Sequence, residues 1–414
     1  MGFSNRLISE YIVNTLKERA LVYLNGARQV GKSTLARNFL GTKEVNYITF
    51  DNSAHLLAAK NDPEQFVKSL PKDTLNILDE VQMVPEIYLA LKAEIDERRL
   101  AGNGKDAFLL TGSANLMAVP ELAKALVGRM AVITLLPFSV NEYNKNCENL
   151  VRKIFDEEFS MKKYPKFNLV ENISNATFPE IALNTKINRK QWFNDYILSI
   201  FQRDIQVIGD IRKPQNLIQL LSSFGIRAGN LLNNSLVMSE IGMDNKTYEK
   251  YKSFLINTFL IFELQPWAKP NRLNKRFVKS PKLYFNDTNL LLWLLKRDVK
   301  DIFEQDKTLM GHIFENFVAT EIMKGLCDLP DISVSHFRTS DNKEVDFVLE
   351  NGNGDTIGIE VKLSGTITQQ DFNGLSLLRE AVGEKFKKGI LLYCGEDCVP
   401  FGNNWAVPVG ALFG

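Results

Sequence analysis

The sequence predicts an α/β protein made of a parallel-sheet domain, a helical module with a two-stranded hairpin, and a second, smaller α/β domain. Three observations predict this order. Apolar strands alternate with helices in the first third, three helical segments and two short strands occupy the middle, and the last third reads helix–strand–strand–strand–helix–strand. At 414 residues the chain is also too long for one ordinary core.

The composition is that of a folded globular protein, with 45% hydrophobic and 24% charged residues. Because the net charge is only +1, a nucleic-acid partner would have to be met by a local basic patch. The apolar runs are too short for a membrane span and no signal segment opens the chain, so we expect a cytoplasmic protein with no membrane partner. Four scattered cysteines disfavour a zinc site and favour reduced thiols.

The strongest functional signal is a glycine-bounded loop between an apolar strand and a helix. Residues 26–33 read GARQVGKS, which fits the P-loop pattern in its required context. Glycines let backbone N–H groups turn toward phosphates, the lysine brings a positive charge, and the serine hydroxyl suits Mg²⁺. The pattern therefore predicts ATP and Mg²⁺ as ligands. The expected binding residues are Gly26, Arg28, Gln29, Val30, Gly31, Lys32, Ser33 and Thr34.

Two further strand ends supply polar side chains to the same site. The strand in TLNILDEVQ ends in Asp79 and Glu80, which we expect to hold Mg²⁺ and to polarise the attacking water, respectively. Acids are also common at a helix start, but the position after a P-loop favours the catalytic interpretation. Ser113, at the end of the strand in DAFLLTGSAN, is placed to sense the terminal phosphate.

Over residues 18–145 the chain resembles the ATPase module of a bacterial and archaeal AAA-type family. The resemblance rests on GARQVGKST, ILDEVQ, LLTGSAN, LVGR and LLPFSVNEY. It implies ATP hydrolysis, completed by an arginine at the γ-phosphate, and Arg129 is the matching position. Arg129 could act in its own chain or on a neighbour's nucleotide, the latter in a homo-oligomer. The alternative is a surface salt bridge.

The middle of the chain predicts a winged-helix-like module. Asn234 opens a short helix that Gly242 ends, and Asp244 caps the next helix, so that helix, tight turn and helix precede two strands. Basic residues lie on the last helix and also between the strands, in a stretch that contains no acid, and could contact DNA. These candidates are Lys246, Lys250, Arg272, Lys275 and Arg276, with Tyr248 beside the first two. A solvated hairpin tip or a docking surface for a protein partner are the alternatives.

The last third carries charged residues inside apolar strands. In EVDFVLENGNGDTIGIEVK, Asp346 and Glu360 lie on neighbouring strands, one of them bulged, and Lys362 shares a face with Glu360. This layout resembles the PD-(D/E)XK nuclease core, in which two such carboxylates bind a divalent cation and the lysine activates water. Glu315, on the preceding helix, would be a third ligand or an orienting group. An ordinary hairpin with a Glu–Lys pair is the alternative.

Taken as a whole, the chain resembles a family in which an AAA-type module precedes a domain of unknown function with a nuclease-like core. KLYFNDTNLL, GHIFENFV, EVDFVL and IEVK are the matching pieces. We expect an ATPase domain at 1–145, a connector at 146–190, the winged-helix-like domain at 191–295 and the nuclease-like domain at 296–414. The expected function is an ATPase coupled to DNA binding and a metal-dependent nuclease. The alternative is a nucleotide-switched regulatory or binding protein with an inactive nuclease-like domain.

Overall fold

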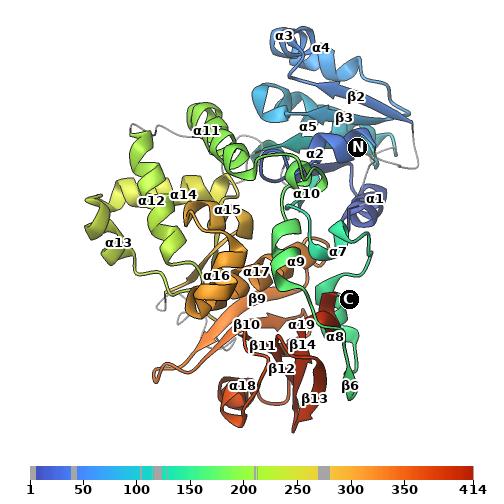
Figure 1. Ribbon diagram of the computed structural model, residues 1–414. Helices are drawn as coiled ribbons and strands as arrows, with labels where there is room; N and C mark the ends of the chain where they lie inside the picture. Colours follow the sequence, from blue (N-terminus) through green and yellow to red (C-terminus); the bar gives the residue numbers. More distant parts are fainter. Residues whose placement is uncertain are drawn as a thin grey trace.

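The computed structural model describes residues 6–38, 44–102, 105–113, 115, 124–126, 128–208, 211, 213–268 and 280–413. Three parts follow one another along the chain: a five-stranded sheet with its helices, a helical module, and a seven-stranded sheet with its helices (Figure 1). The predicted DNA contacts Arg272, Lys275 and Arg276 lie outside the described residues.

The first sheet is parallel throughout, in the order β2-β3-β4-β1-β5. Its strands are β1 (Leu21–Asn25), β2 (Val45–Thr49), β3 (Leu75–Asp79), β4 (Phe108–Gly112) and β5 (Met130–Thr134), and its helices are α1 (Ser9–Glu18), α2 (Lys32–Arg37), α3 (Ser53–Asn61), α4 (Pro63–Lys68) and α5 (Ile87–Leu100). The parallel α/β domain predicted from the sequence is confirmed. Because all strands run the same way, the polar strand ends of β1, β3 and β4 meet at one edge.

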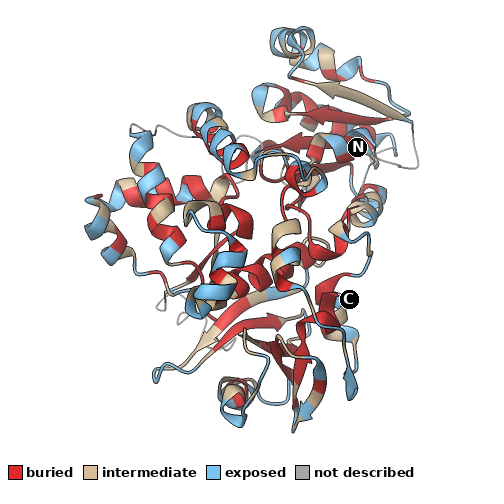
Figure 2. Cartoon of the chain, in the orientation of Figure 1, coloured by how far each residue is buried: buried red, intermediate tan, exposed pale blue. Residues whose placement is uncertain are grey.

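Both faces of this sheet are buried, which explains why its strands are continuous apolar runs rather than alternating ones. In β1, Val22 and Leu24 pack into one core, while Leu21 and Tyr23 pack into the core on the other side. All four side chains are fully buried, and Figure 2 shows the central strands as a buried layer between more exposed helices.

Short elements lead from the five-stranded sheet to the rest of the molecule. They are α7 (Val140–Tyr143), α8 (Leu150–Asp156), β6 (Lys162–Lys163), α9 (Leu169–Asn175), α10 (Pro179–Leu183) and the long α11 (Arg189–Ile208). Strand β6 pairs with β13 (Asp397–Phe401) of the last sheet, so this segment returns to the C-terminal part before the helical module begins. The domain boundaries predicted from the sequence remain a prediction.

The helical module contains the predicted helices and hairpin in the predicted order. They are α12 (Pro214–Ile226), α13 (Asn234–Ile241), α14 (Asn245–Asn257) and the antiparallel pair β7 (Ile261–Leu264) and β8 (Lys282–Phe285). Gly242 ends α13 with φ 62°, and the Asp244 carboxylate caps α14 by accepting from the Thr247 N–H at 3.0 Å. The assignment of these elements to a DNA-binding winged helix stays a prediction.

The last part is a second α/β domain on a mixed sheet, in the order β6-β13-β14-β12-β11-β10-β9. Its further elements are α15 (Thr288–Leu294), α16 (Val299–Gln305), α17 (Lys307–Gly325), β9 (Ser333–Arg338), β10 (Glu344–Glu350), β11 (Thr356–Lys362), α18 (Asn373–Val382), β12 (Phe386–Tyr393), β14 (Asn404–Pro408) and α19 (Val409–Phe413). The pairing of β10 with β9 shifts register between Val345 and Val348, which is the bulge expected next to Asp346.

One hydrophobic core runs through all three parts. It contains Leu24 of β1, Leu220 of α12 and Ile359 of β11 in a single cluster. The parts are therefore packed against one another, and not only joined through linkers. Within the described ranges, no helix is long and apolar enough to cross a membrane.

Candidate nucleotide site and carboxylate cluster

The loop between β1 and α2 has the backbone that a phosphate-binding loop requires. Gly26 has φ +144° and Gly31 has φ +96°, in regions that side chains disfavour. A Cβ atom on Gly26 would lie 2.1 Å from the Leu135 carbonyl oxygen, so only glycine fits there. The loop therefore turns tightly at the carboxyl edge of the sheet, with the start of α2 behind it.

Lys32 is a buried cation at the base of this loop, with 5% of its surface exposed. Its Nζ donates to the carbonyl oxygens of Gly26 at 3.0 Å and Ala27 at 2.8 Å. Burial lowers the pKa of Lys32 to about 8, because the desolvated ammonium is disfavoured. The loop carbonyls are neutral dipoles and compensate the positive charge of Lys32 only in part. A bound polyphosphate would provide the missing negative charge.

We expect ATP affinity to fall as the pH rises above about 8, since only the protonated Lys32 attracts the phosphates. The direction of this pH dependence follows from the effect of the ligand on Lys32. A bound phosphate raises the pKa of the lysine, so at alkaline pH the protein takes up a proton when ATP binds, and this lowers the affinity. Affinity at pH 9.5 should be about tenfold or more below that at pH 7.5. Titration with a fluorescent ATP analogue measures this. Lys32→Arg, which does not titrate, should show a flat profile, and an equal slope in both proteins would contradict the prediction.

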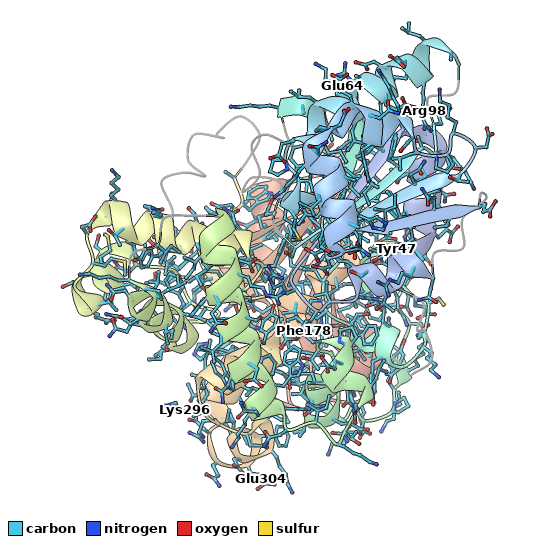
Figure 3. All side chains as sticks on the ribbon, turned by 90° about the horizontal axis from the view of Figure 1, so that it is seen from above. Tyr47, Glu64, Arg98, Phe178, Lys296 and Glu304 are labelled. Carbon is cyan, nitrogen blue, oxygen red and sulfur yellow. The ribbon has the colours of Figure 1, made fainter. Side chains whose placement is uncertain are left out.

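Asp79 lies at the end of β3 and is surrounded by hydroxyl groups. Its Oδ1 accepts from Ser33 Oγ at 2.9 Å and from Thr111, and its Oδ2 accepts from the Tyr47 hydroxyl at 2.6 Å. Burial, and then the bond to Asp79, raise the pKa of Tyr47 to about 12, so the phenol remains a donor. Figure 3 labels Tyr47 on the edge of the ATPase sheet. Ser33 and Asp79 were predicted together from the sequence, whereas Tyr47 and Thr111 were not.

The chemistry of this group fits Mg²⁺. Hydroxyl and carboxylate oxygens are the ligands that Mg²⁺ prefers, and the ion usually adds phosphate and water oxygens. Ser33 and Asp79 would hold it, with Thr111 and Tyr47 fixing the carboxylate by hydrogen bonds. Their joint position beside Lys32 follows from the adjacency of β1, β3 and β4 in the sheet.

Glu80 follows Asp79 with the unusual φ of +60°, which turns the chain into a short 3₁₀ segment, Val81–Met83. The Gln82 side-chain amide donates to the Glu80 carboxylate and, at 3.3 Å, to Ser113 Oγ. The structure thus brings the predicted base and the predicted phosphate sensor together through Gln82. The only sequence signal for Gln82 was its place in the run DEVQ.

Arg28 of the loop forms an ion pair with Asp204, which lies near the C-terminal end of α11. Its Nε and Nη2 atoms donate to the two Asp204 oxygens at 2.8 and 2.5 Å. Asp204 is only 4% exposed, so this bidentate pair is largely shielded from water. Another residue of the loop is bound as well, since Arg6 Nη1 donates to the Val30 carbonyl oxygen at 2.9 Å. The Arg28 side chain is therefore engaged by another element, and not directed freely at a nucleotide.

Arg129 does not join the nucleotide site of its own chain. The register of β1 and β5 pairs Leu21 with Met130, so Arg129 lies at the strand-start edge, opposite the phosphate loop that follows Asn25. Five residues of strand separate the two edges by about 17 Å. Arg129 forms an ion pair with Asp96 at 2.7 Å. Of the interpretations left open by the sequence, the parallel register disfavours action within its own chain, and the pair with Asp96 is the salt bridge named as the alternative; a role on a neighbour's nucleotide stays a prediction.

The C-terminal acids converge, but around a lysine. Lys282 Nζ, from the first residue of β8, lies 2.8 Å from Asp346 Oδ1 and 2.9 Å from Glu315 Oε1. The Tyr284 hydroxyl donates to the same Glu315 oxygen at 2.6 Å. Burial, and then the nearby Asp346 carboxylate, raise the pKa of Glu360 well above its usual value. We call Lys282, Glu315, Asp346 and Glu360 the carboxylate cluster.

The predicted metal ligands Glu315, Asp346 and Glu360 do not fit a metal in this structure. Across the part of the chain that is described, no group of three or more His, Cys, Asp or Glu side chains is placed to hold a metal ion. The physical reason is that the Lys282 ammonium already binds Asp346 Oδ1 and Glu315 Oε1, two of the oxygens that a cation would need, while Glu360 Oε2 is buried without a hydrogen-bond partner. Lys362, predicted to activate water, is instead paired with Asp371. The expected metal site is therefore corrected to an ion-paired cluster.

The predicted DNA-facing helix exposes some of its candidates and buries another. Lys246 and Lys250 of α14 are exposed, whereas Tyr248 is fully buried and donates its hydroxyl to Asn234 Oδ1 at 2.6 Å. Because Tyr248 faces the core of the helical module, it cannot reach a groove. Of the basic residues predicted to contact DNA, only the two lysines of α14 therefore belong to the described surface.

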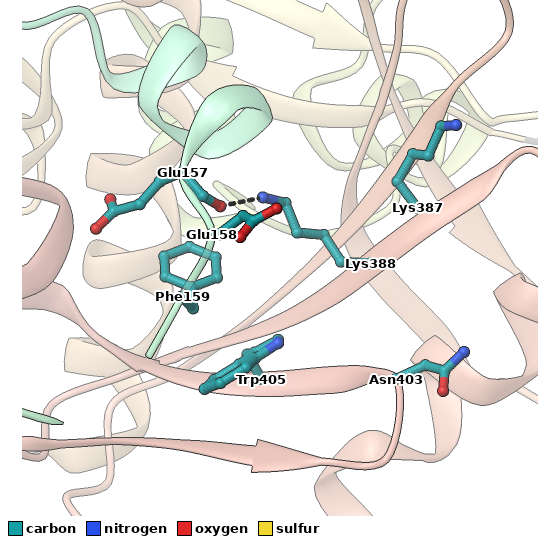
Figure 4. Close-up of a pocket in the computed structure, with 7 residues that line it drawn as sticks. All are labelled: Glu157, Glu158, Phe159, Lys387, Lys388, Asn403 and Trp405. Carbon is teal, nitrogen blue, oxygen red and sulfur yellow. Dashed lines mark hydrogen bonds between the residues drawn. The ribbon is translucent and has the colours of Figure 1, made fainter. Parts of the chain in front are cut away.

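A separate pocket of about 400 Å³ lies between the connector and the C-terminal sheet (Figure 4). It is lined by Glu157, Glu158, Phe159, Lys387, Lys388, Asn403 and Trp405. Lys388 Nζ donates to the Glu157 carbonyl oxygen at 2.6 Å and lies 4.9 Å from the Phe159 ring centroid. These contacts fasten the connector to β12, and the pocket contains none of the predicted site residues.

Three family models match successive parts of the chain. Residues 18–144 match a family model described as an AAA domain. Residues 18–144 form an AAA-type ATPase domain. Residues 167–301 and 310–412 match two models described as domains of unknown function, DUF8612 and DUF4143. These descriptions carry no activity for the helical module or the C-terminal domain.

The chain is similar at low sequence identity to several known proteins. Uncharacterized proteins of Mycobacterium bovis and Mycobacterium tuberculosis are each 24% identical over 352 residues, covering 85% of this chain and 72% of theirs. The Walker-type ATPase of Pyrococcus abyssi is 15% identical, with a TM-score of 0.41, and covers 69% of this chain and 94% of its own. AMPPCP-bound DnaA from Aquifex aeolicus is 13% identical, with a TM-score of 0.30, and covers 78% and 94%.

Proposed function

We propose that the protein hydrolyses ATP and uses its nucleotide state to control how the helical module and the C-terminal domain bind DNA. The observation that carries the ATPase part is the assembly of Lys32, Ser33 and Asp79 at one edge of the sheet, with Ser33 and Asp79 2.9 Å apart. The match of residues 18–144 to an AAA domain supports the same assignment.

Each residue of this site has a defined task in the proposal. Loop amides and Lys32 bind the phosphates, and Ser33 with Asp79 holds Mg²⁺, which neutralises phosphate charge when bound. Glu80 accepts a proton from the attacking water, and Ser113 contacts the terminal phosphate. Arg129, which lies away from its own loop, would serve the nucleotide of a neighbouring copy in a homo-oligomer.

Contacts of the phosphate loop support the proposed coupling. Arg28 is bound to Asp204 of α11, the helix that leads into the helical module. Nucleotide binding moves or stiffens the loop, and a bidentate pair transmits such a change to its partner helix. The ATPase domain can thereby bias the position of α12, α13 and α14.

The proposed DNA contacts are exposed or closely spaced cations. Lys246 and Lys250 are exposed on α14, and residues 269–279 contain several cations and no acid. Such groups bind phosphates without reading bases. DNA cleavage is not part of the proposal, because the carboxylate cluster does not fit a metal.

DNA affinity should change when ATP is added to the wild-type protein and should not change in Lys32→Ala, which lacks the phosphate-binding cation. Replacing Arg272, Lys275 and Arg276 by alanine should weaken binding and reduce the slope of log affinity against log salt, by about 0.9 for each phosphate that is no longer neutralised. Fluorescence anisotropy over a salt series measures both effects.

The matched control replaces Lys186, Arg297 and Lys300, three exposed cations elsewhere on the described surface, by alanine. This control variant has the same net charge as the variant of Arg272, Lys275 and Arg276. It should keep the wild-type slope of log affinity against log salt. If wild-type protein shows no DNA binding at low salt, or if both triple variants lose affinity equally, the proposed DNA interface is wrong. A protein partner for the helical module would then be the remaining hypothesis.

A further inference from the structure

We propose that the ammonium group of Lys282 takes the place of a divalent cation in the carboxylate cluster, which makes the C-terminal domain a metal-independent module. The inference concerns a different site from the ATPase and does not depend on it. It assigns a role to a buried lysine in a position where the sequence pattern indicated a metal.

Burial is the first observation. Lys282 is 1% exposed, and a lysine is almost never buried to this extent unless it is paired. Its Nζ lies 2.8 and 2.9 Å from two carboxylate oxygens and 3.9 Å from Glu344 Oε1. The two short separations are those of charge-assisted hydrogen bonds from an ammonium. The group therefore supplies the positive charge that holds the acids together.

The hydrogen bonds of the carboxylate oxygens are the second observation. Asp346 uses Oδ1 for Lys282 and Oδ2 for the Val361 N–H, which donates at 3.0 Å. Glu315 Oε1 accepts from both Lys282 and Tyr284. These three oxygens already accept hydrogen bonds from groups of the protein itself, whereas Glu360 Oε2 is buried without a partner. A metal could bind them only by displacing Lys282 from its buried position, which would leave an unpaired ammonium next to a dication.

The third observation is the place of the lysine in the fold. Lys282 belongs to β8, which pairs with β7 and is not part of the seven-stranded sheet that carries Asp346. The other strand of the hairpin is fastened to the same sheet, because His336 N donates to the Gln265 oxygen at 3.0 Å and Trp267 N to the His336 oxygen at 2.6 Å. Because Leu264 pairs with Lys282, Lys282 fastens the second strand of the hairpin at this same end.

The consequence is a role in positioning. In the sequence, residues 269–279, which carry the predicted basic contacts and lie outside the described residues, come between β7 and β8. With Lys282 in the carboxylate cluster, both of these strands are held against the C-terminal sheet. A metal-binding nuclease core would need the same acids free, so the two uses of these residues exclude each other.

The test is Mn²⁺ binding to the full chain, measured through the electron paramagnetic resonance signal of the ion that stays free in solution. All proteins carry Asp79→Asn, which removes the predicted metal ligand of the phosphate loop. The protein with Lys282 intact should show no site that depends on Asp346, and its melting temperature should be insensitive to Mn²⁺ or EDTA. Lys282→Ala should gain Mn²⁺ binding, about one ion per chain, and Lys282→Ala with Asp346→Asn should lose it again.

Lys324→Ala is the matched control. Lys324 is another buried lysine, paired with Glu321 at 2.8 Å outside the carboxylate cluster, so its removal should lower the melting temperature without creating a metal site. If Lys282→Ala does not fold, the proposal is still tested by comparing Mn²⁺ binding to the protein with Lys282 and Asp346 intact and to the Asp346→Asn variant. Mn²⁺ binding or Mn²⁺-dependent DNA cleavage that Asp346→Asn abolishes would overturn the proposal, as would a folded Lys282→Ala that gains no site.

Discussion

Glu80→Gln should lower kcat for ATP hydrolysis by about 10²- to 10⁴-fold while ATP still binds. Glutamine keeps the size of the side chain and can accept the Gln82 hydrogen bond, but its amide cannot take a proton from water. Asp79 and Lys32, which bind the metal and the phosphates in the proposed function, remain in place. Phosphate release at saturating ATP measures kcat, and a fluorescent ATP analogue measures binding.

The control for this variant is Glu86→Gln, six residues further along the chain at an exposed position. It should hydrolyse ATP at the wild-type rate. A loss of less than tenfold in Glu80→Gln would show that another group accepts the proton, and a parallel loss of ATP binding would show that Glu80 holds the loop together instead. The two readouts therefore separate a chemical role from a structural one.

The nucleotide site could be predicted largely from the sequence because its groups follow strands whose ends must meet. A parallel sheet places the ends of β1, β3 and β4 at one edge, and short motifs specify which side chains stand there. Tyr47 and Thr111 also bind Asp79, but a single hydroxyl on a strand carries no motif. The role of Arg129 stayed open for a related reason: the motif gives its neighbours in sequence, whereas the register decides at which edge of the sheet it lies.

The carboxylate cluster shows a different limit. The sequence correctly placed Glu315, Asp346 and Glu360 near one another, since strand alternation and the bulge in β10 are local properties. What it could not indicate was the cation between them. Lys282 lies 64 residues before Asp346 in chain order and in a different sheet, and nothing in KLYFND distinguishes a buried lysine from an exposed one. Only the packing of β8 on α17 decides this.

Glu142→Ala should destabilise the ATPase domain by about 3–5 kcal/mol, because it leaves the Arg6 guanidinium buried without its counter-charge. The two side chains are each 5% exposed and lie 2.9 Å apart. Glu142 also accepts from the backbone N–H groups of Leu7 at 2.9 Å and Ser139 at 3.0 Å. Thermal unfolding followed by circular dichroism should show a fall in melting temperature. Glu148→Ala, at the exposed pair with Lys153, should cost less than about 1 kcal/mol.

A double variant separates the two roles of Arg6. Arg6 pairs with Glu142, but its Nη1 also donates to the Val30 carbonyl oxygen of the phosphate loop at 2.9 Å. In Arg6→Met with Glu142→Leu no buried charge is left unpaired, so part of the lost stability should return, while the Leu7 and Ser139 N–H groups stay without their acceptor. The bond to Val30 stays absent, so ATP affinity should remain below that of the wild type. Recovery of both properties would mean that Arg6 only balances Glu142, whereas recovery of stability alone would establish that this buried arginine also sets the shape of the phosphate loop.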